Sequence, residues 1–335
     1  MKKVRSYLSL IKFSHTIFAM PFALVGFFIG LNTLSETSYG DGQWNLNKTI
    51  DLMWDLEAGI LPFSEDSLLA KIAIGNATIE AIGRCFLLVI LCMVFARSAA
   101  MAFNRYLDRK FDAKNPRTAI REIPKGIITP KNALTFTIVS SMLFVVCTFF
   151  INRLCFYLSP VALAVILGYS YTKRFTPLCH LVLGLGLSLA PIGAYLAVTG
   201  VFALLPILFS LAVLFWVSGF DIIYALQDEE FDRSQNLYSI PAWMGKTKAL
   251  RVSELLHLLS AGAIVYAGIY GTFGWLYWIG VAVFTGMLLY QHSIVKPNDL
   301  KRVNVAFMTA NGIASVVFAI FVIADLFINI PKWPE

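Results

Sequence analysis

Two short motifs carry acidic side chains at a spacing that suits divalent metal ions. The first contains Asn104, Asp108 and Asp112, and the second contains Asp228 and Asp232. Residues four apart lie one turn above another on the same face of a helix. Carboxylate and amide oxygens stacked in this way repel one another unless a cation lies between them, and oxygen ligands favour a hard ion such as Mg²⁺. The two motifs therefore predict a magnesium site.

Basic side chains near both motifs are candidates for holding an anion beside the metal. Arg117 and Arg121 follow the first motif, and Lys173 follows Tyr169 four residues later in another part of the chain. Magnesium in proteins is usually bound by one or two carboxylates together with substrate phosphates. A planar guanidinium can grip two phosphate oxygens, and fixed cations stabilise the charge that gathers on a departing diphosphate. We therefore expect Arg117, Arg121 and Lys173 to bind a diphosphate.

The second motif begins with two further polar residues, inside an apolar segment. They are Asp221 and Tyr224, and an ionisable residue at such a depth is by default a functional candidate because burying it is costly. Together with Lys173 they form the predicted catalytic group, in which Asp221 or Tyr224 would orient an acceptor or stabilise a carbocation. Arg97, two turns before Asn104, is expected either to pair with an acidic residue or to meet a carboxylate of the acceptor.

Long apolar runs must position these residues. Of the 335 residues, 58% are hydrophobic and only 14% are charged, whereas soluble proteins carry about 25% charged residues. Runs of about 20 apolar residues recur, the length that crosses a hydrocarbon core about 30 Å thick. The first run has a basic front but no small-residue cleavage site, so we interpret it as a transmembrane helix. Nine spans are predicted, at 11–31, 78–103, 133–151, 154–172, 179–199, 203–223, 254–271, 273–293 and 303–328.

The basic residues are distributed unequally between the two sides of this predicted bundle. The N-terminus and the loops that follow even-numbered spans hold 21 of the 27 lysines and arginines. The positive-inside rule places these segments, and with them both acidic motifs, in the cytoplasm. The excess of positive charge is therefore a topology signal, and no nucleic-acid partner is expected. We expect a multi-pass protein of the cytoplasmic (inner) membrane with a cytoplasmic N-terminus.

The chain is expected to form a single domain over residues 1–335, with a long extracytoplasmic loop at about 32–77. This loop is acidic and is interpreted as a solvated outer segment, part of which has the character of an interfacial amphipathic helix. The five cysteines lack the paired spacing of a zinc site and are interpreted as small buried hydrophobes. His15, His180, His257 and His292 are scattered over different spans and are expected in helix-end or core positions.

Taken together, the motifs resemble those of the intramembrane aromatic prenyltransferase superfamily, and in particular its 4-hydroxybenzoate polyprenyltransferase branch. The first motif is similar to the family pattern N-x3-D-x3-D and continues into a family-like stretch at 115–126. The second is similar to D-x2-Y-x3-D-x3-D, and Tyr169 with Lys173 is similar to Y-x3-K. The similarity covers nearly the whole chain. The loop at 32–77 departs from it, since a short connection is expected there.

The resemblance implies an all-α integral membrane fold, with nine transmembrane helices around a central cavity, a cytoplasmic cap and a lateral portal to the lipid. It also implies magnesium-dependent transfer of a polyprenyl group from polyprenyl diphosphate to an aromatic acid in quinone biosynthesis. Ionisation of the allylic carbon–oxygen bond would give a carbocation that the electron-rich ring attacks. The expected partners are these two substrates and the lipid bilayer, and no protein partner is predicted.

The sequence is also compatible with three alternative functions. The acceptor could be a dihydroxynaphthoate of the menaquinone pathway, a porphyrin or a glycerol phosphate instead of 4-hydroxybenzoate. A membrane transporter would use intramembrane carboxylates as an ion relay, although the acidic residues gather at one face and not along a path at the midplane. A phosphatidyl-alcohol transferase would need an Asp-Gly pair ahead of its aspartates, and the pair at 41–42 lies in the outer loop without the rest of that motif.

Overall fold

The computed structural model describes residues 6–7, 9–10, 18–36, 67–68 and 79–328. Within this part of the chain there are nine long helices and no β-strand. The long helices are α2 (Met20–Glu36), α5 (Ile79–Lys114), α6 (Pro130–Ile151), α7 (Arg153–Thr172), α8 (Cys179–Thr199), α9 (Leu204–Ala225), α11 (Ile240–Tyr270), α12 (Trp275–Ile294) and α13 (Asn311–Ile328). Three short elements complete the fold: the 3₁₀ turn η2 (Leu226–Asp228), α10 (Glu229–Ser234) and the π-helical segment η3 (Val305–Ala310).

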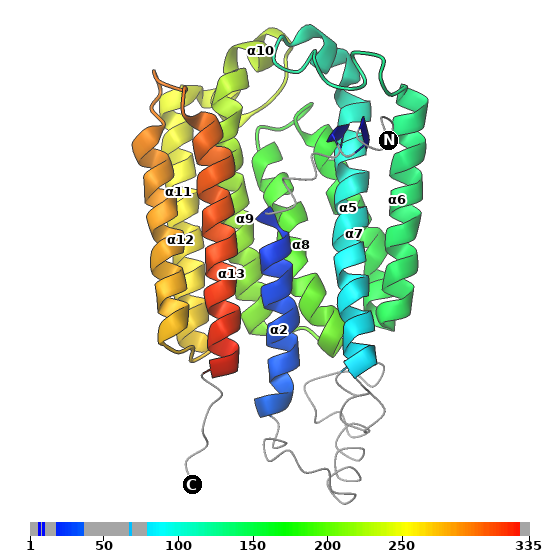
Figure 1. Cartoon of the computed structure of the whole chain (residues 1–335). Coiled ribbons are helices and arrows are strands. Elements are labelled where there is room, and N and C mark those ends of the chain that lie inside the picture. Colours follow the sequence, from blue (N-terminus) through cyan, green and yellow to red (C-terminus); the bar gives the residue numbers. More distant parts are fainter. Residues whose placement is uncertain (1–5, 8, 11–17, 37–66, 69–78, 329–335) are drawn as a thin grey trace, which may run out of the picture.

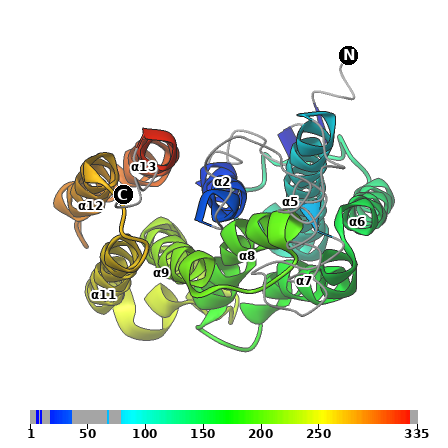
Figure 2. The same cartoon turned by 90° about the horizontal axis from the view of Figure 1, so that it is seen from below.

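The long helices run along a common axis and form one bundle (Figure 1). Seen from below, α11, α9, α8 and α7 form one side of the bundle, α12 and α6 lie at its two ends, and α13, α2 and α5 form the other side (Figure 2). Helix α2 packs against α8 and α13. The segment 115–129 and α10 lie across one end of the bundle, and we refer to these two segments as the cap.

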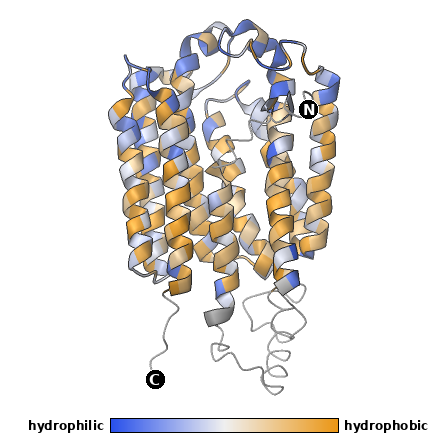
Figure 3. Ribbon diagram, in the orientation of Figure 1, coloured by the Kyte–Doolittle hydropathy of each residue, from blue (hydrophilic) through white to orange (hydrophobic). Residues whose placement is uncertain are grey.

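The surface of the bundle is that of a membrane protein. Large apolar side chains such as Met142, Phe149 and Phe150 on α6 are exposed, and Figure 3 shows hydrophobic residues along the helices and hydrophilic ones at the capped end. Seven described helices are long and apolar enough to cross a membrane, and α2 is a shorter apolar helix over Met20–Thr33. The prediction of an all-α integral membrane fold is confirmed, but the count of nine spans is not exact, since α12 is not among the seven. The predicted outer loop at 32–77 lies largely outside the described residues.

Capping residues explain where several helices begin and end. The Thr129 side chain accepts a hydrogen bond from the backbone N–H of Asn132, and Pro130 follows it at the first helical position, where proline is favoured. Asn152 separates α6 from α7, because its side chain caps α7 and donates to the carbonyl of Leu196 on α8 at 2.8 Å. Gly200 ends α8 with φ of 71°, a conformation that favours glycine.

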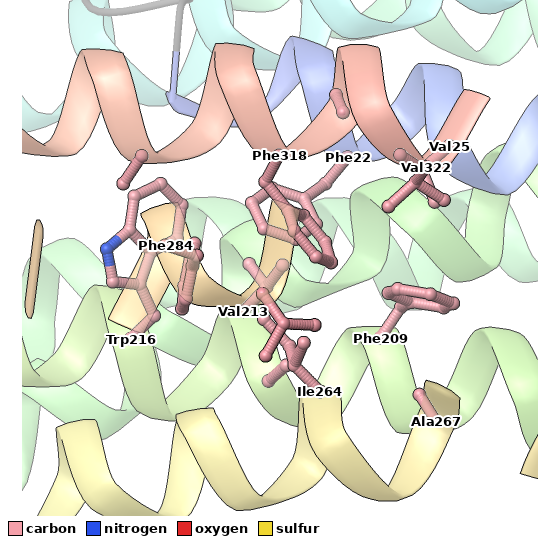
Figure 4. Close-up of a cluster of buried hydrophobic side chains, with 14 of the residues drawn as sticks. Phe22, Val25, Phe209, Val213, Trp216, Ile264, Ala267, Phe284, Phe318 and Val322 are labelled. Carbon is pink, nitrogen blue, oxygen red and sulfur yellow. The ribbon is translucent and has the colours of Figure 1, made fainter. Parts of the chain in front are cut away.

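A core of packed aromatic rings holds one half of the bundle together. Trp216 of α9 is fully buried and packs against Phe22 of α2 and Phe284 of α12, with ring centroids 5.4 Å and 5.7 Å away (Figure 4). Phe318 of α13 adds a further contact to Phe284 at 5.5 Å. Aromatic pairs of this kind contribute about 0.5–1.5 kcal/mol each beyond their area burial. The packing therefore fixes α9, the helix that leads into the second acidic motif.

Two helices differ from their predicted bounds in ways that matter for the site. Helix α5 continues past the predicted end of its span at residue 103 and reaches Lys114, so the first acidic motif lies on a continuous helix. Helix α11 begins at Ile240, well before the predicted start at 254, and is kinked at Gly245, where φ is 81°. Charged and polar residues lowered the apolar signal of both segments, although the backbone there remains helical.

Candidate active site

A polar cavity of about 280 Å³ lies beneath the cap. It is lined by residues of α5, α7, α8 and α9, of the cap, and of η3. All ten predicted site residues line it, so the two motifs that are far apart in the sequence face the same space. These residues are Asn104, Asp108, Asp112, Arg117, Arg121, Lys173, Asp221, Tyr224, Asp228 and Asp232.

Asp108 is the most heavily paired carboxylate of the first motif. It is 2% exposed, and Lys173 and Arg174 approach its two oxygens at 2.7 Å and 3.0 Å. The Asn104 side chain donates a further hydrogen bond to it at 3.2 Å. Both cations come from the carboxyl end of α7, where the guanidinium of Arg174 also donates to the carbonyls of Ser170 and Leu107. The end of α7 therefore supplies two positive charges to a single aspartate of α5.

Asp112, one turn further along α5, has one paired and one unpaired oxygen. Arg121 of the cap donates to Oδ1 at 2.6 Å, and the Thr118 hydroxyl donates to the backbone carbonyl of Asp112 at 3.1 Å. The other oxygen, Oδ2, is buried and has no hydrogen-bond partner within the described chain. A buried carboxylate oxygen without a partner is unfavourable, so this atom is a candidate ligand for a cation.

Arg117 joins the cap to the second motif. Its guanidinium contacts Asp228 through Nη2 and through Nε, which lies 3.1 Å from Oδ1, and its Nη1 donates to the Tyr224 hydroxyl at 2.8 Å. The Asn115 side chain also donates to Asp228 at 3.1 Å. Burial acts to lower the pKa of Arg117, but the negative charge of Asp228 and the neighbouring Tyr224 raise it above its ordinary value. Arg117 is therefore a fixed cation at the rim of the cavity.

The other two acidic residues of the second motif are held from α8 and from the start of α11. The Ser239 hydroxyl donates to Asp232 at 2.9 Å, and Ser239 also caps α11 by accepting from the N–H of Ala242 at 3.2 Å. Asp221 lies 2.7 Å from Nδ1 of His180 on α8. Because the chain passes from α9 through η2 into α10 here, the second motif does not lie on one regular helix as the first does.

The donor atoms of the cavity suit magnesium, but they are not gathered into a ready chelate. Among the described residues, no three aspartate, glutamate, histidine or cysteine side chains lie close enough to hold one ion. Instead Asp108, Asp112 and Asp228 are each paired with at least one basic side chain. Carboxylate and amide oxygens are the ligands of a hard cation, and Oδ2 of Asp112 still needs a partner. The residues present therefore fit a magnesium ion that is completed by substrate phosphates.

Several residues that line the cavity or contact its lining were not singled out in the sequence. Arg174 and Asn115 stand beside predicted residues, so adjacency to the motifs was a signal that could have found them. Arg105 directly follows Asn104 and offered the same signal; it is 3% exposed, and its Nε and Nη1 have no hydrogen-bond partners in the described structure. Arg97 also lines the cavity. Its buried Nε has no hydrogen-bond partner, and no described carboxylate forms an ion pair with it, so the expected pairing with an acidic residue is not found.

An apolar cavity of about 340 Å³ adjoins the polar one between α5, α6, α7 and α8. The two cavities share five lining residues, namely Arg97, Met101, Tyr169, Leu183 and Leu187. The remaining lining is almost entirely apolar, with side chains such as Val89, Phe144 and Ile166. The polar site is therefore continuous with a hydrophobic space inside the bundle.

Comparison with known proteins identifies a single family. The model of the UbiA prenyltransferase family matches residues 68–313. The chain is 30% identical over 233 residues to the 4-hydroxybenzoate octaprenyltransferase of Nitrosospira multiformis, an alignment that covers 70% of this chain and 80% of that protein. It is 31% identical over 240 residues to the 4-hydroxybenzoate octaprenyltransferase of Tolumonas auensis, with 70% and 82% covered.

Solved structures of the same family share the fold. A UbiA homologue from Aeropyrum pernix K1, determined in its apo form, is 25% identical with a TM-score of 0.68, and the match covers 94% of this chain and 98% of that one. A UbiA homologue from Archaeoglobus fulgidus, solved with DMAPP and Mg²⁺, is 18% identical with a TM-score of 0.64, covering 96% and 99%. The resemblance inferred from the motifs is thereby confirmed.

Proposed function

The chain belongs to the UbiA prenyltransferase family and is a prenyltransferase, and from this premise we propose that it transfers a polyprenyl group from polyprenyl diphosphate to an aromatic acid in quinone biosynthesis, with Mg²⁺. The observation that carries the proposal is the convergence of both acidic motifs and their basic partners on one cavity beneath the cap. Family membership supports an enzyme and argues against the transporter alternative. A benzoate is the favoured acceptor because the relatives are named for 4-hydroxybenzoate.

The diphosphate would bind where the ion pairs now lie. Asn104, Asp108, Asp112, Asp228 and Asp232 would hold magnesium, which when bound neutralises the leaving diphosphate. The basic side chains of Arg117, Arg121 and Lys173 would exchange their carboxylate partners for phosphate oxygens. Each partner is charged in both arrangements, so the exchange leaves no ion unpaired in the cavity. The diphosphate and the metal would thus bind together: the diphosphate would take over the basic side chains, and the carboxylates freed in this way would bind the metal.

The polyprenyl tail would occupy the adjoining apolar cavity. A chain of many isoprene units is insoluble in water and enters from the bilayer, and the continuity of the two cavities at Met101, Leu183 and Leu187 provides an apolar path from the diphosphate. The reacting allylic carbon, one bond from the diphosphate, would then lie near the boundary between the cavities. Exclusion of water from this boundary would protect a carbocation from hydrolysis.

The aromatic acid would lie between Arg97 and the pair formed by Asp221 and Tyr224. Arg97 is a buried cation without an ion pair in the described structure, which suits the carboxylate of the acceptor. Asp221 and Tyr224 would orient the ring and steady the cation, with Lys173 beside the departing group. The capped end would face the cytoplasm, because the basic loops gather there. We further propose a single domain over 1–335 in the cell inner membrane, with its N-terminus inside.

The test is a prenyl transfer assay with purified protein. Labelled polyprenyl diphosphate and Mg²⁺ would be supplied with a panel of acceptors that includes 4-hydroxybenzoate and a dihydroxynaphthoate. We expect a prenylated acid that requires the metal, and the preferred acid identifies the acceptor. Undiminished turnover in Asp108→Ala or Asp228→Ala would contradict the metal site. Product from no aromatic acid in the panel would contradict the proposed acceptor class.

A further inference from the structure

His180 is a buried histidine that contacts a proposed site residue. It is the second residue of α8 and is 3% exposed. Its Nδ1 lies 2.7 Å from Oδ2 of Asp221 on α9, and the Asp221 side chain is 24% exposed and lines the polar cavity. His180 itself also lines this cavity, in contact with Asp221. Sequence reasoning assigned this histidine to the helix end or core and gave it no role in the site.

The surroundings of His180 determine which ring nitrogen carries the proton. The backbone N–H of Ile240, at the start of α11, donates to Nε2 at 3.4 Å. A backbone amide can only donate, so Nε2 accepts from it when the imidazole is neutral, and the proton then lies on Nδ1. Nδ1–H then donates to Oδ2 of Asp221. The Ser218 hydroxyl also donates to the carbonyl of His180 at 3.1 Å, which holds the backbone of α8 at this point.

We propose that His180 is a positioning residue that fixes the orientation of Asp221 toward the acceptor. Its hydrogen bond occupies Oδ2 of Asp221, while Oδ1 makes no hydrogen bond within the described chain. The carboxylate thus keeps one oxygen for the cavity and cannot rotate freely. This inference rests on the proposed function, because it requires Asp221 to face the aromatic acid. A bond between an imidazole and a carboxylate commonly orients a functional group in this way.

The start of α11 links both ends of the second motif through this arrangement. Ile240 sets the tautomer of His180 and so acts on Asp221, while the neighbouring Ser239 donates directly to Asp232. Two consecutive residues of one helix terminus therefore control aspartates that lie eleven positions apart. The backbone N–H of Ile240 is one of the donors that a helix start leaves without an intrahelical partner, so its use here also satisfies α11.

The experiment compares three substitutions that separate the two ring nitrogens. The amide of His180→Asn can place a donor near the position of Nδ1, that of His180→Gln reaches toward Nε2, and His180→Ala removes both groups. We expect His180→Asn to keep kcat within about 3-fold, and the other two to lower kcat about 10- to 100-fold, the effect of misplacing a reacting group. KM for polyprenyl diphosphate should change little. Equal kcat in all four proteins, or a loss in His180→Asn as large as in His180→Ala, would overturn the proposal.

His257 provides a matched control. It is also 3% exposed, and its ring nitrogens contact His292 at 2.9 Å and the carbonyl of Trp216 at 3.3 Å, away from the lining of the cavity. His257→Ala should lower the melting temperature without lowering kcat of the folded protein. If His180→Ala does not fold, the comparison of kcat between His180→Asn and His180→Gln still tests the positioning role, because both variants keep a polar side chain of similar size.

A double substitution separates this inference from the proposed function. If His180 acts through Asp221, His180→Gln should have almost no further effect on kcat in an Asp221→Asn background. Independent, multiplicative losses would contradict the positioning role and leave the enzyme assignment intact. Undiminished turnover in Asp108→Ala, or turnover that does not require Mg²⁺, would instead contradict the proposed function itself.

Discussion

The two acidic motifs share a spacing of four residues but differ in how the fold supports them. The first lies on α5, whose regular geometry stacks Asn104, Asp108 and Asp112 on one face. The second crosses from α9 through a 3₁₀ turn into α10, so its aspartates are held by side chains from elsewhere. Helical periodicity thus sets the relative positions of the residues in the first motif, whereas tertiary contacts set those in the second, and basic side chains from other segments pair with both. The first motif should depend on its own side chains, and the second on its supports.

The largest expected effect tests the first motif directly. Asp108→Ala removes the buried carboxylate that Lys173 and Arg174 contact. Turnover should fall by at least about 1,000-fold, because both metal binding and the placement of two cations are lost. The measurement is prenyl transfer at saturating Mg²⁺. Asp299→Ala, on an exposed aspartate that does not line the cavity, is the control and should leave turnover unchanged.

The next effect tests the link between the motifs. Arg117→Lys keeps a positive charge but loses the planar fork that contacts Asp228 and Tyr224 together. We expect kcat/KM to fall by about 10- to 100-fold, since an ammonium cannot replace bidentate contacts. The assay varies the concentration of polyprenyl diphosphate. A variant as active as the parent would show that charge alone suffices at this position.

A smaller effect is expected at a support of the second motif. Ser239→Ala removes both the hydrogen bond to Asp232 and the N-cap of α11. Stability should fall by about 1 kcal/mol, as for other lost caps, and the Mg²⁺ concentration for half-maximal activity should rise. Thr129→Ala removes the N-cap hydrogen bond of α6, and Thr129 does not line the cavity, so this variant should lower the free energy of unfolding by a similar amount. An unchanged metal requirement in Ser239→Ala would mean that Asp232 needs no support.

The smallest effect concerns the second cation on Asp108. Arg174→Gln leaves Lys173 in place at 2.7 Å. Activity should fall by only about 2- to 5-fold, because a partly exposed ion pair contributes less than about 1 kcal/mol. Steady-state kinetics of Arg174→Gln and Lys173→Gln, measured side by side, would show how much each of the two basic side chains contributes to activity. A larger loss in Arg174→Gln than in Lys173→Gln would show that the predicted diphosphate ligand was assigned to the wrong neighbour.

The sequence predicted the membrane fold and most of the charged residues that line the site, but it predicted few of the contacts between those residues. All ten candidate residues line one cavity, although their roles remain predictions. The bounds of α5 and α11 were missed where charged residues interrupt the apolar pattern. The supports of the second motif were missed because they come from distant segments: His180 precedes Asp221 by 41 residues, and Asn115 precedes Asp228 by 113.

The sequence by itself therefore determined where most of the helices lie, which family the motifs resemble, and which face of α5 is acidic. These features follow from hydropathy and helical period, which are properties of neighbouring residues. Only the tertiary structure decided which cation meets which carboxylate, that Arg97 has no acidic partner in the described chain, and that α11 begins where it can hold His180 and Asp232. Such pairings depend on how helices pack and cross, and the packing arises from the aromatic core and the bundle as a whole.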